Sequence, residues 1–257
     1  MKIKSNAKIN LNLKITGIKD GYHMLDSIFV PINIYDDIEI VESDKDEIIG
    51  MNIDMHDNIM YKAINLVRKE FNINKKFKIS INKNIPMQAG LGGGSSNAAS
   101  ILKALNEMLS LNSSKKELAR MGLELGSDVP FFIFNEPSKV EGRGEIITRL
   151  KNFEKIHGVL VFDDMYFSTK DVYHIYDLLS NKEIINNDLE LAARTMIRGD
   201  RIIDIENKLL ECGAYQASLT GSGGAIFGLF YKKEDVASAA HMLKSKYAYV
   251  KSFESLN

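Results

Sequence analysis

The chain has 257 residues, which suffices for two domains of ordinary size or for one large domain. Its 33 Lys and Arg residues nearly balance its 34 Asp and Glu residues, and the formal net charge of −1 argues against a nucleic-acid partner held by net charge. The single cysteine, Cys212, excludes an intrachain disulfide bond and a zinc site built from cysteines.

Residues 1–6 lack the apolar segment of a signal peptide, and no run of 18 or more apolar residues follows them. We therefore expect a cytoplasmic protein without a membrane partner. A strand is predicted over residues 7–15, where apolar and polar residues alternate without a break. One face carries Ala7, Ile9, Leu11, Leu13 and Ile15, and the other carries Lys8, Asn10, Asn12 and Lys14. We expect Lys8 and Asn10 to reach a cleft and Lys14 to be solvated.

The chain then turns between Gly17 and Gly21, and the next strand is predicted to begin at Ser27. Tyr22 and His23 follow the turn. An aromatic ring and an imidazole in this place can stack on a ligand and hydrogen-bond to it. From position alone, a structural tyrosine and an idle histidine explain the pair equally well.

Residues 84–102 contain no Asp, Glu, Lys or Arg, although 26% of the chain is charged. A helix is predicted over residues 97–111 from the helical spacing of its apolar residues, with Ser95, Ser96 and Asn97 as candidate caps. The preceding loop holds Gly90, Gly92, Gly93 and Gly94. Free backbone N–H groups at a helix N-terminus bind anions, so the loop is a candidate phosphate site.

A plain glycine-rich turn is the alternative interpretation of this loop. It is not a Walker A loop, because no Gly-Lys-Ser/Thr sequence ends it. It is also a poor dinucleotide-binding fingerprint, because the glycine spacing differs.

Helices are predicted over residues 58–71 and 115–125, and Asp128 then precedes an apolar, strand-like run at 131–134. Asp128 is either a turn or cap aspartate, or a carboxylate that projects into a cleft and accepts a proton.

After about Leu150 the pattern changes, and we place a boundary between Leu150 and Ile156. Strands are predicted at 156–162, on both sides of a turn at 220–224, and at 248–253; helices are predicted at 169–179, 189–196, 202–211 and 236–244. Such a pattern predicts an α+β sandwich. The turn lies in a second charge-free stretch, residues 214–231, and alone it would be taken for an ordinary hairpin turn.

Three segments, 7–13, 86–99 and 219–224, resemble the three motifs of the superfamily of galactokinase, homoserine kinase, mevalonate kinase and phosphomevalonate kinase (GHMP kinases). Further segments are similar to one branch of it: Asp20–His23, Ser127–Phe132 and Asn187–Glu190. The resemblance implies a two-domain fold, with an ATP-binding domain like the second domain of ribosomal protein S5 at 1–152 and a ferredoxin-like domain at 153–257.

That branch phosphorylates the 2-hydroxyl of 4-(cytidine 5′-diphospho)-2-C-methyl-D-erythritol, giving the 2-phosphate and ADP in non-mevalonate isoprenoid biosynthesis. The resemblance therefore implies ATP and Mg²⁺ as cofactors and a small-molecule substrate, with no nucleic acid and no membrane. We expect a monomer or a homodimer.

Residue roles are likewise implied by the resemblance. Asp128 matches the catalytic base and Lys8 its charge partner. The resemblance assigns ATP binding to Pro86, Gly90, Leu91, Gly92, Gly93, Gly94, Ser95 and Ser96. It assigns substrate binding to Asn10, Tyr22, His23, Thr169, Gly221 and Ser222. No side chain stands out as a metal ligand, so we expect Mg²⁺ to be held by phosphates and a hydroxyl such as that of Ser95 or Ser96.

Two alternatives remain. The chain could phosphorylate another small alcohol, such as homoserine or a mevalonate derivative, or it could bind a nucleotide without catalysis. Tyr22, His23 and Asn10 favour a substrate with a nucleotide head group, because small alcohols need no stacking partner. The presence of both Lys8 and Asp128 argues against a non-catalytic protein.

Overall fold

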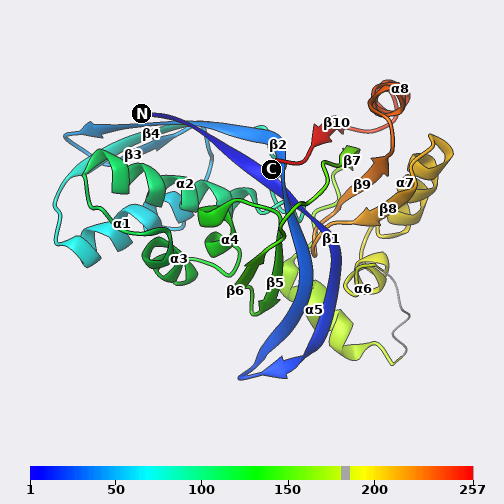
Figure 1. Ribbon diagram of the computed structural model, residues 1–257, viewed down its shortest axis with the longest axis horizontal. Helices are drawn as coiled ribbons and strands as arrows, with labels where there is room; N and C mark the ends of the chain where they lie inside the picture. The colour runs from blue at the N-terminus through cyan, green and yellow to red at the C-terminus, as the bar shows by residue number, and fades with distance from the viewer. Residues whose placement is uncertain (181–185, 257) are drawn as a thin grey trace.

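The computed structural model describes residues 1–180 and 186–256, and the strands in these ranges form two sheets (Figure 1). In the first sheet the order is β3-β4-β2-β5-β6, and β1 pairs with β2. Its strands are β1 (Lys2–Lys19), β2 (Tyr22–Ser43), β3 (Glu47–Ile49), β4 (Lys76–Asn82), β5 (Ser138–Gly142) and β6 (Ile146–Arg149).

Four helices of the described chain accompany this sheet: α1 (Ile59–Phe71), α2 (Gly93–Met108), α3 (Lys115–Leu123) and α4 (Val129–Phe134). They pack on one face of it, where apolar residues of β2 and β4 meet those of α1, α2 and α4 in one buried core (Figure 1). Burial of this apolar surface is the main stabilisation of the N-terminal half.

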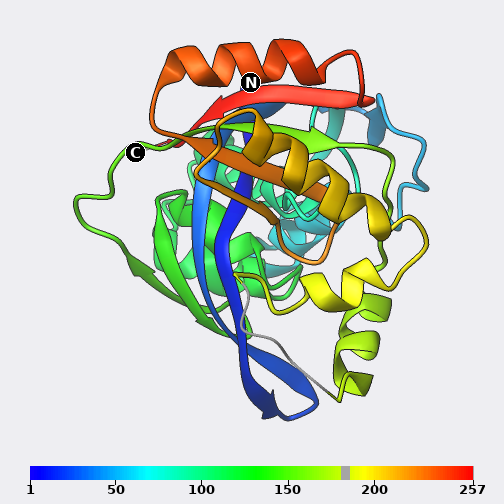
Figure 2. The same cartoon turned by 90° about the vertical axis from the view of Figure 1, so that its right-hand side faces the viewer.

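The second sheet has the order β10-β7-β9-β8. It consists of β7 (His157–Phe162), β8 (Gln216–Leu219), β9 (Ala225–Phe230) and β10 (Tyr249–Glu254), and its helices are α5 (Thr169–Leu178), α6 (Glu190–Arg194), α7 (Asp200–Glu211) and α8 (Lys233–Leu243). Helices α7 and α8 cover its outer face (Figure 2). The inner face of β7 and β9 packs against Ala7, Ile9 and Val30 of the long β1–β2 hairpin.

The β1–β2 hairpin thus belongs to both halves of the molecule. Its turn is formed by Asp20 and Gly21, which both have positive φ (51° and 77°), as the tight hairpin turn requires. The expected second strand therefore begins at Tyr22, earlier than Ser27.

The prediction that the apolar residues of the first strand all share one face is wrong, because the register shifts between Asn10 and Asn12. This bulge inserts Leu11 as an extra residue. In consequence Ala7 and Ile9 pack under the second sheet, whereas Leu13 joins the core beneath α5–α7.

Two local expectations about helices are also corrected. Helix α2 begins at Gly93 rather than Asn97, so Ser95, Ser96 and Asn97 lie inside it and cannot cap it. The run at 131–134 is helix α4, not strand, because Val129 and Pro130 open a helix whose apolar residues are buried on α2 and α3.

The mixed helix and sheet content confirms the predicted α+β class. The predicted boundary at 150–156 falls in the connection between β6 and β7. In the described part of the chain, no helix combines the length and the hydropathy needed to span a membrane.

Candidate active site

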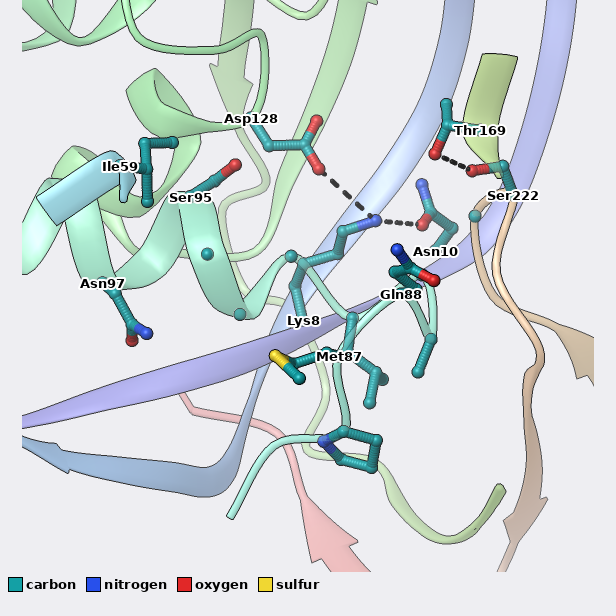
Figure 3. A pocket seen from close by; sticks show the side chains of 18 of the residues that line it. Lys8, Asn10, Ile59, Met87, Gln88, Ser95, Asn97, Asp128, Thr169 and Ser222 are labelled. Carbon is teal, nitrogen blue, oxygen red and sulfur yellow. Dashed lines mark hydrogen bonds and ion pairs between the residues drawn. The ribbon is translucent and has the colours of Figure 1, made fainter. Parts of the chain in front are cut away.

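A pocket of about 470 Å³ lies where the two halves meet. Its walls come from β1 and β2, the glycine loop with the start of α2, Asp128 before α4, the start of α5, and the β8–β9 turn. Most of the residues singled out in the sequence therefore come together in one place (Figure 3).

The glycine loop presents backbone N–H groups to this pocket. Gly92 is the N-cap of α2 in left-handed conformation, and no described side chain caps the helix. The first intrahelical bond runs from the Ser96 N–H to the Gly92 carbonyl, so the N–H groups of residues 93–95 are not used within the helix. These donors and the helix dipole attract an anion.

Close packing explains two of the glycines. A Cβ atom at Gly90 would lie 2.0 Å from the Thr220 carbonyl oxygen, and one at Gly92 would lie 2.8 Å from the Phe132 ring. Both residues also have positive φ (77° and 67°), which disfavours other residues. The loop is therefore held directly against the turn at 220–224 and against α4.

Lys8 and Asp128 face each other beside the loop, with the Lys8 Nζ 3.7 Å from the Asp128 Oδ2 (Figure 3). The Lys8 side chain is only 4% exposed, whereas that of Asp128 is 30% exposed. Burial lowers the pKa of Lys8, and the Asp128 carboxylate opposes this shift. The Lys8 ammonium also donates to the Asn10 Oδ1 at 2.5 Å and lies 4.6 Å from the centre of the Phe29 ring.

Asn10 is held in place on its other sides. Its Nδ2 donates to the Ser27 Oγ at 3.0 Å, and its backbone N–H donates to the Thr220 Oγ1 at 2.9 Å. The β8–β9 turn thus contacts the strand that carries Lys8, which an ordinary hairpin turn would not need to do.

The opposite wall is formed by α5 and the turn. The Thr169 and Ser222 hydroxyls lie 2.8 Å apart, and Gly221 lines the pocket beside them (Figure 3). Tyr173, one turn further along α5, also lines the pocket. Burial, and secondarily the Asp128 charge, raise the pKa of Tyr173, so its phenol stays neutral.

Tyr22 and His23 are not among the described residues that line the pocket. Tyr22 is 51% exposed, and the Arg143 guanidinium carbon lies 3.5 Å from the centre of its ring. His23 packs on Tyr173 with 4.6 Å between ring centres, and its Nε2 lies 2.8 Å from the Asp177 Oδ1. His23 therefore lies against Tyr173 and does not line the pocket itself.

The loop residues differ in what they offer. Pro86, Leu91 and Ser95 line the pocket, but Ser96 is 2% exposed and its hydroxyl accepts a hydrogen bond from the Ser5 hydroxyl at 2.8 Å. Ser95, rather than Ser96, is therefore the available hydroxyl at the start of α2.

Sequence reasoning missed Lys83 and Tyr173. Lys83 lines the pocket beside the loop and forms an ion pair with the fully buried Asp36. Its Nζ lies 3.4 Å from the position of a Cβ at Gly93. Its place as the last charged residue before the charge-free stretch was the available signal. For Tyr173 the signal was its position four residues after Thr169 on a predicted helix.

The chain is similar to known proteins over nearly its whole length. Residues 58–136 match the GHMP kinase N-terminal domain, and residues 175–248 match the GHMP kinase C-terminal domain. A solved 4-(cytidine 5′-diphospho)-2C-methyl-D-erythritol kinase superposes with a TM-score of 0.86 at 25% identity, over 100% of both chains. The mevalonate kinase of Methanococcus jannaschii shares the fold, with a TM-score of 0.76 at 18% identity over 100% of this chain and 98% of its own.

The fold is that of a GHMP kinase, an ATP-dependent small-molecule kinase. The 4-diphosphocytidyl-2-C-methyl-D-erythritol kinase of Clostridium tetani is 39% identical over 96% of this chain and 97% of its own. That of Clostridioides difficile is 37% identical over 97% and 93%. The chain belongs to the family of these 4-diphosphocytidyl-2-C-methyl-D-erythritol kinases.

Proposed function

We propose that the chain transfers the γ-phosphoryl group of ATP to the 2-hydroxyl of 4-(cytidine 5′-diphospho)-2-C-methyl-D-erythritol, releasing the 2-phosphate and ADP. The observation that carries this function is the Lys8–Asp128 pair, with 3.7 Å between Nζ and Oδ2, in the same pocket as the uncapped start of α2. The names of the relatives support the choice of substrate.

ATP would lie along the glycine loop, with its phosphates on the N–H groups at the start of α2. Lys83 adds positive charge beside the loop. Apolar side chains continue the pocket on the far side and suit the base: Met51, Ile59 and Met87. ATP and acceptor would thus meet at the junction of an N-terminal domain, 1–152, and a C-terminal domain, 153–257.

The structure offers a partial ligand set for Mg²⁺. No group of three or more His, Cys, Asp or Glu residues in the described chain could hold a metal by itself. Mg²⁺ in kinases binds mainly through substrate phosphates and one or two protein oxygens. The Ser95 hydroxyl, which lines the pocket, fits that need, and a bound Mg²⁺ would neutralise phosphate charge.

In the proposed step, the 2-hydroxyl oxygen of the acceptor attacks the γ-phosphorus of ATP. Its proton passes to the Asp128 carboxylate, and the bond between the γ-phosphorus and the bridging oxygen breaks to release ADP. The Lys8 ammonium, 3.7 Å from the Asp128 carboxylate, offsets charge on the transferring group.

The cytidine end would lie toward α5. Tyr173 offers the aromatic face that lines the pocket, His23 supports that ring, and Thr169, Gly221 and Ser222 form the wall beside it. Asn10 borders the acceptor side. A role for Tyr22 in stacking on cytosine stays a prediction, because its ring is 51% exposed and lies on Arg143.

A coupled assay of ADP release tests this function. With ATP and Mg²⁺, we expect turnover with the cytidine diphosphate substrate at a kcat/KM at least about 100-fold above that with homoserine or mevalonate. Preferred turnover of either small alcohol would show a GHMP kinase with another acceptor. ATP binding without ADP release for any of the three would favour the non-catalytic alternative.

A further inference from the structure

Asn187 lies behind the wall of the pocket and clamps the β8–β9 turn. It is 1% exposed, and its Nδ2 donates to the carbonyl oxygens of Leu219 (3.0 Å) and Gly221 (2.8 Å). Its Oδ1 accepts the Leu189 N–H at 3.0 Å. The amide therefore bridges the two carbonyls on either side of Thr220, a task that needs two donors on one nitrogen.

The segment that carries Asn187 is itself attached to β1. The Leu13 N–H donates to the Asn186 carbonyl at 2.8 Å, and the Asp188 N–H donates to the Leu13 carbonyl at 2.9 Å. Asn187 thus links the turn, through its side chain, to the strand that carries Lys8.

From the turn, contacts lead to the reacting groups. Thr220 is fully buried, and its hydroxyl accepts the Asn10 N–H at 2.9 Å. The Asn10 Oδ1 accepts the Lys8 ammonium at 2.5 Å, and Lys8 faces Asp128. A shift of Thr220 would therefore move the acceptor that orients Lys8.

We propose that Asn187 is a positioning residue for Lys8, acting through Thr220 and Asn10. The inference rests on the proposed function, which gives Lys8 and Asp128 their roles in phosphoryl transfer. The phosphates of ATP bind at the start of α2 and not at Lys8. Loss of the Asn187 hydrogen bonds should therefore lower kcat more than it raises the KM for ATP.

The variant Asn187→Asp tests this role. Aspartate keeps the acceptor for the Leu189 N–H but sets an oxygen against the carbonyls of Leu219 and Gly221. We expect kcat to fall about tenfold while the KM for ATP stays within about twofold. The activity of the variant relative to the parent should rise as the pH falls, since a protonated carboxyl regains one donor. Asn186→Asp makes the same charge change at the neighbouring exposed residue and should retain the parent kcat.

A readout independent of activity is the side-chain amide resonance of Asn10 in a ¹⁵N-labelled protein. It should shift in Asn187→Asp and stay in place in Asn186→Asp. An unshifted resonance, an unchanged kcat, or equal losses in both variants would overturn the role. If Asn187→Asp does not fold, Asn187→Ser, which keeps one donor, takes its place under the same criteria.

The proposed function and the positioning role of Asn187 can be refuted independently. Absence of ADP release by the parent with all three acceptors would refute the proposed function. The Asn10 resonance would still decide whether Asn187 positions the residue that holds Lys8.

Discussion

Lys8 is an ammonium group placed where water scarcely reaches it, because its side chain is 4% exposed. Burial disfavours the charged form and lowers the pKa, so Lys8 depends on nearby acceptors to stay protonated. Asp128 supplies the opposite charge at 3.7 Å and Asn10 the closest acceptor at 2.5 Å. Neither contact could be measured from sequence, although both residues were singled out there.

Replacing Asp128 by Asn should leave the fold intact, because the two side chains are nearly isosteric and Asp128 makes no side-chain cap bond in the described structure. We expect kcat to fall at least about 100-fold, since the proton acceptor is lost and Lys8 loses its counter-charge. Steady-state kinetics with a thermal melt as a folding control measures this. Turnover near the parent value in a folded variant would remove Asp128 from its role.

Tyr173 is the residue for which structure changes the expectation about substrate. Tyr173→Ala should raise the KM for the cytidine substrate about tenfold and leave the KM for ATP nearly unchanged, because stacking on a base is worth roughly 1–3 kcal/mol. Tyr173→Phe keeps the ring and serves as the matched control. If Tyr173→Ala raises the KM for ATP as much as the KM for the cytidine substrate, Tyr173 does not stack on cytosine.

At the scale of elements, the site depends on three segments that are close only in space. The glycine loop, the β8–β9 turn and β1 touch through Gly90, Thr220 and Asn10. At Gly90 the backbone of the loop lies directly against the backbone of the turn, with no room for a side chain between them.

A methyl group at Gly90 should therefore disturb both segments. Gly90→Ala places a Cβ 2.0 Å from the Thr220 carbonyl oxygen at a φ of 77°, so we expect lower thermal stability and at least about tenfold weaker ATP binding. Gly21→Ala is the comparison, because Gly21 has the same φ of 77° but a Cβ there meets nothing within 4 Å, so this variant should leave ATP binding unchanged. Calorimetric titration with ATP and thermal melts measure both. Equal ATP affinity for Gly90→Ala and the parent would show that the close contact at Gly90 does not shape the ATP-binding loop.

At the scale of the whole molecule, a buried charge network supports the C-terminal half beneath the site. The Arg194 guanidinium lies 2.5 Å from Glu190 and 3.0 Å from Glu206, and Glu190 accepts the Leu219 N–H. One guanidinium cannot neutralise two carboxylates. Burial, and secondarily the Glu190 charge, raise the pKa of Glu206 to about 8.

This pKa predicts how stability depends on pH. Between the ordinary value of 4.5 and about 8, the folded protein binds the Glu206 proton more tightly than the unfolded chain does. Its contribution to stability is present at low pH and is lost as the pH rises through about 8. Glu206→Gln should therefore show a smaller fall in Tm than the parent across this window.

The control for this measurement is Glu234→Gln, which removes an exposed carboxylate from α8. It should retain the pH dependence of the parent. Parallel Tm curves for the parent and Glu206→Gln would contradict the assigned pKa.

Much of the fold and of the site could be predicted from the sequence, because helices, strands and turns depend largely on residues close together in the chain. Apolar periodicity placed most helices and strands to within a few residues, and glycines at 90–94 marked a loop before a helix. The incorrect predictions arose where packing against other elements overrode the preference of the local sequence. The bulge at Leu11 and the helix at 129–134 follow from contacts with other elements, which periodicity does not encode.

By itself, the sequence determined the residue types at the site, the α+β class and the family, since motifs and periodicity are properties of the chain order. Only the tertiary structure decided that Lys8 lies 3.7 Å from Asp128, that Ser96 turns inward while Ser95 does not, and that Tyr173 rather than Tyr22 lines the pocket. These facts depend on distances between segments far apart in the chain. Such distances are set by how the two sheets and the β1–β2 hairpin pack together.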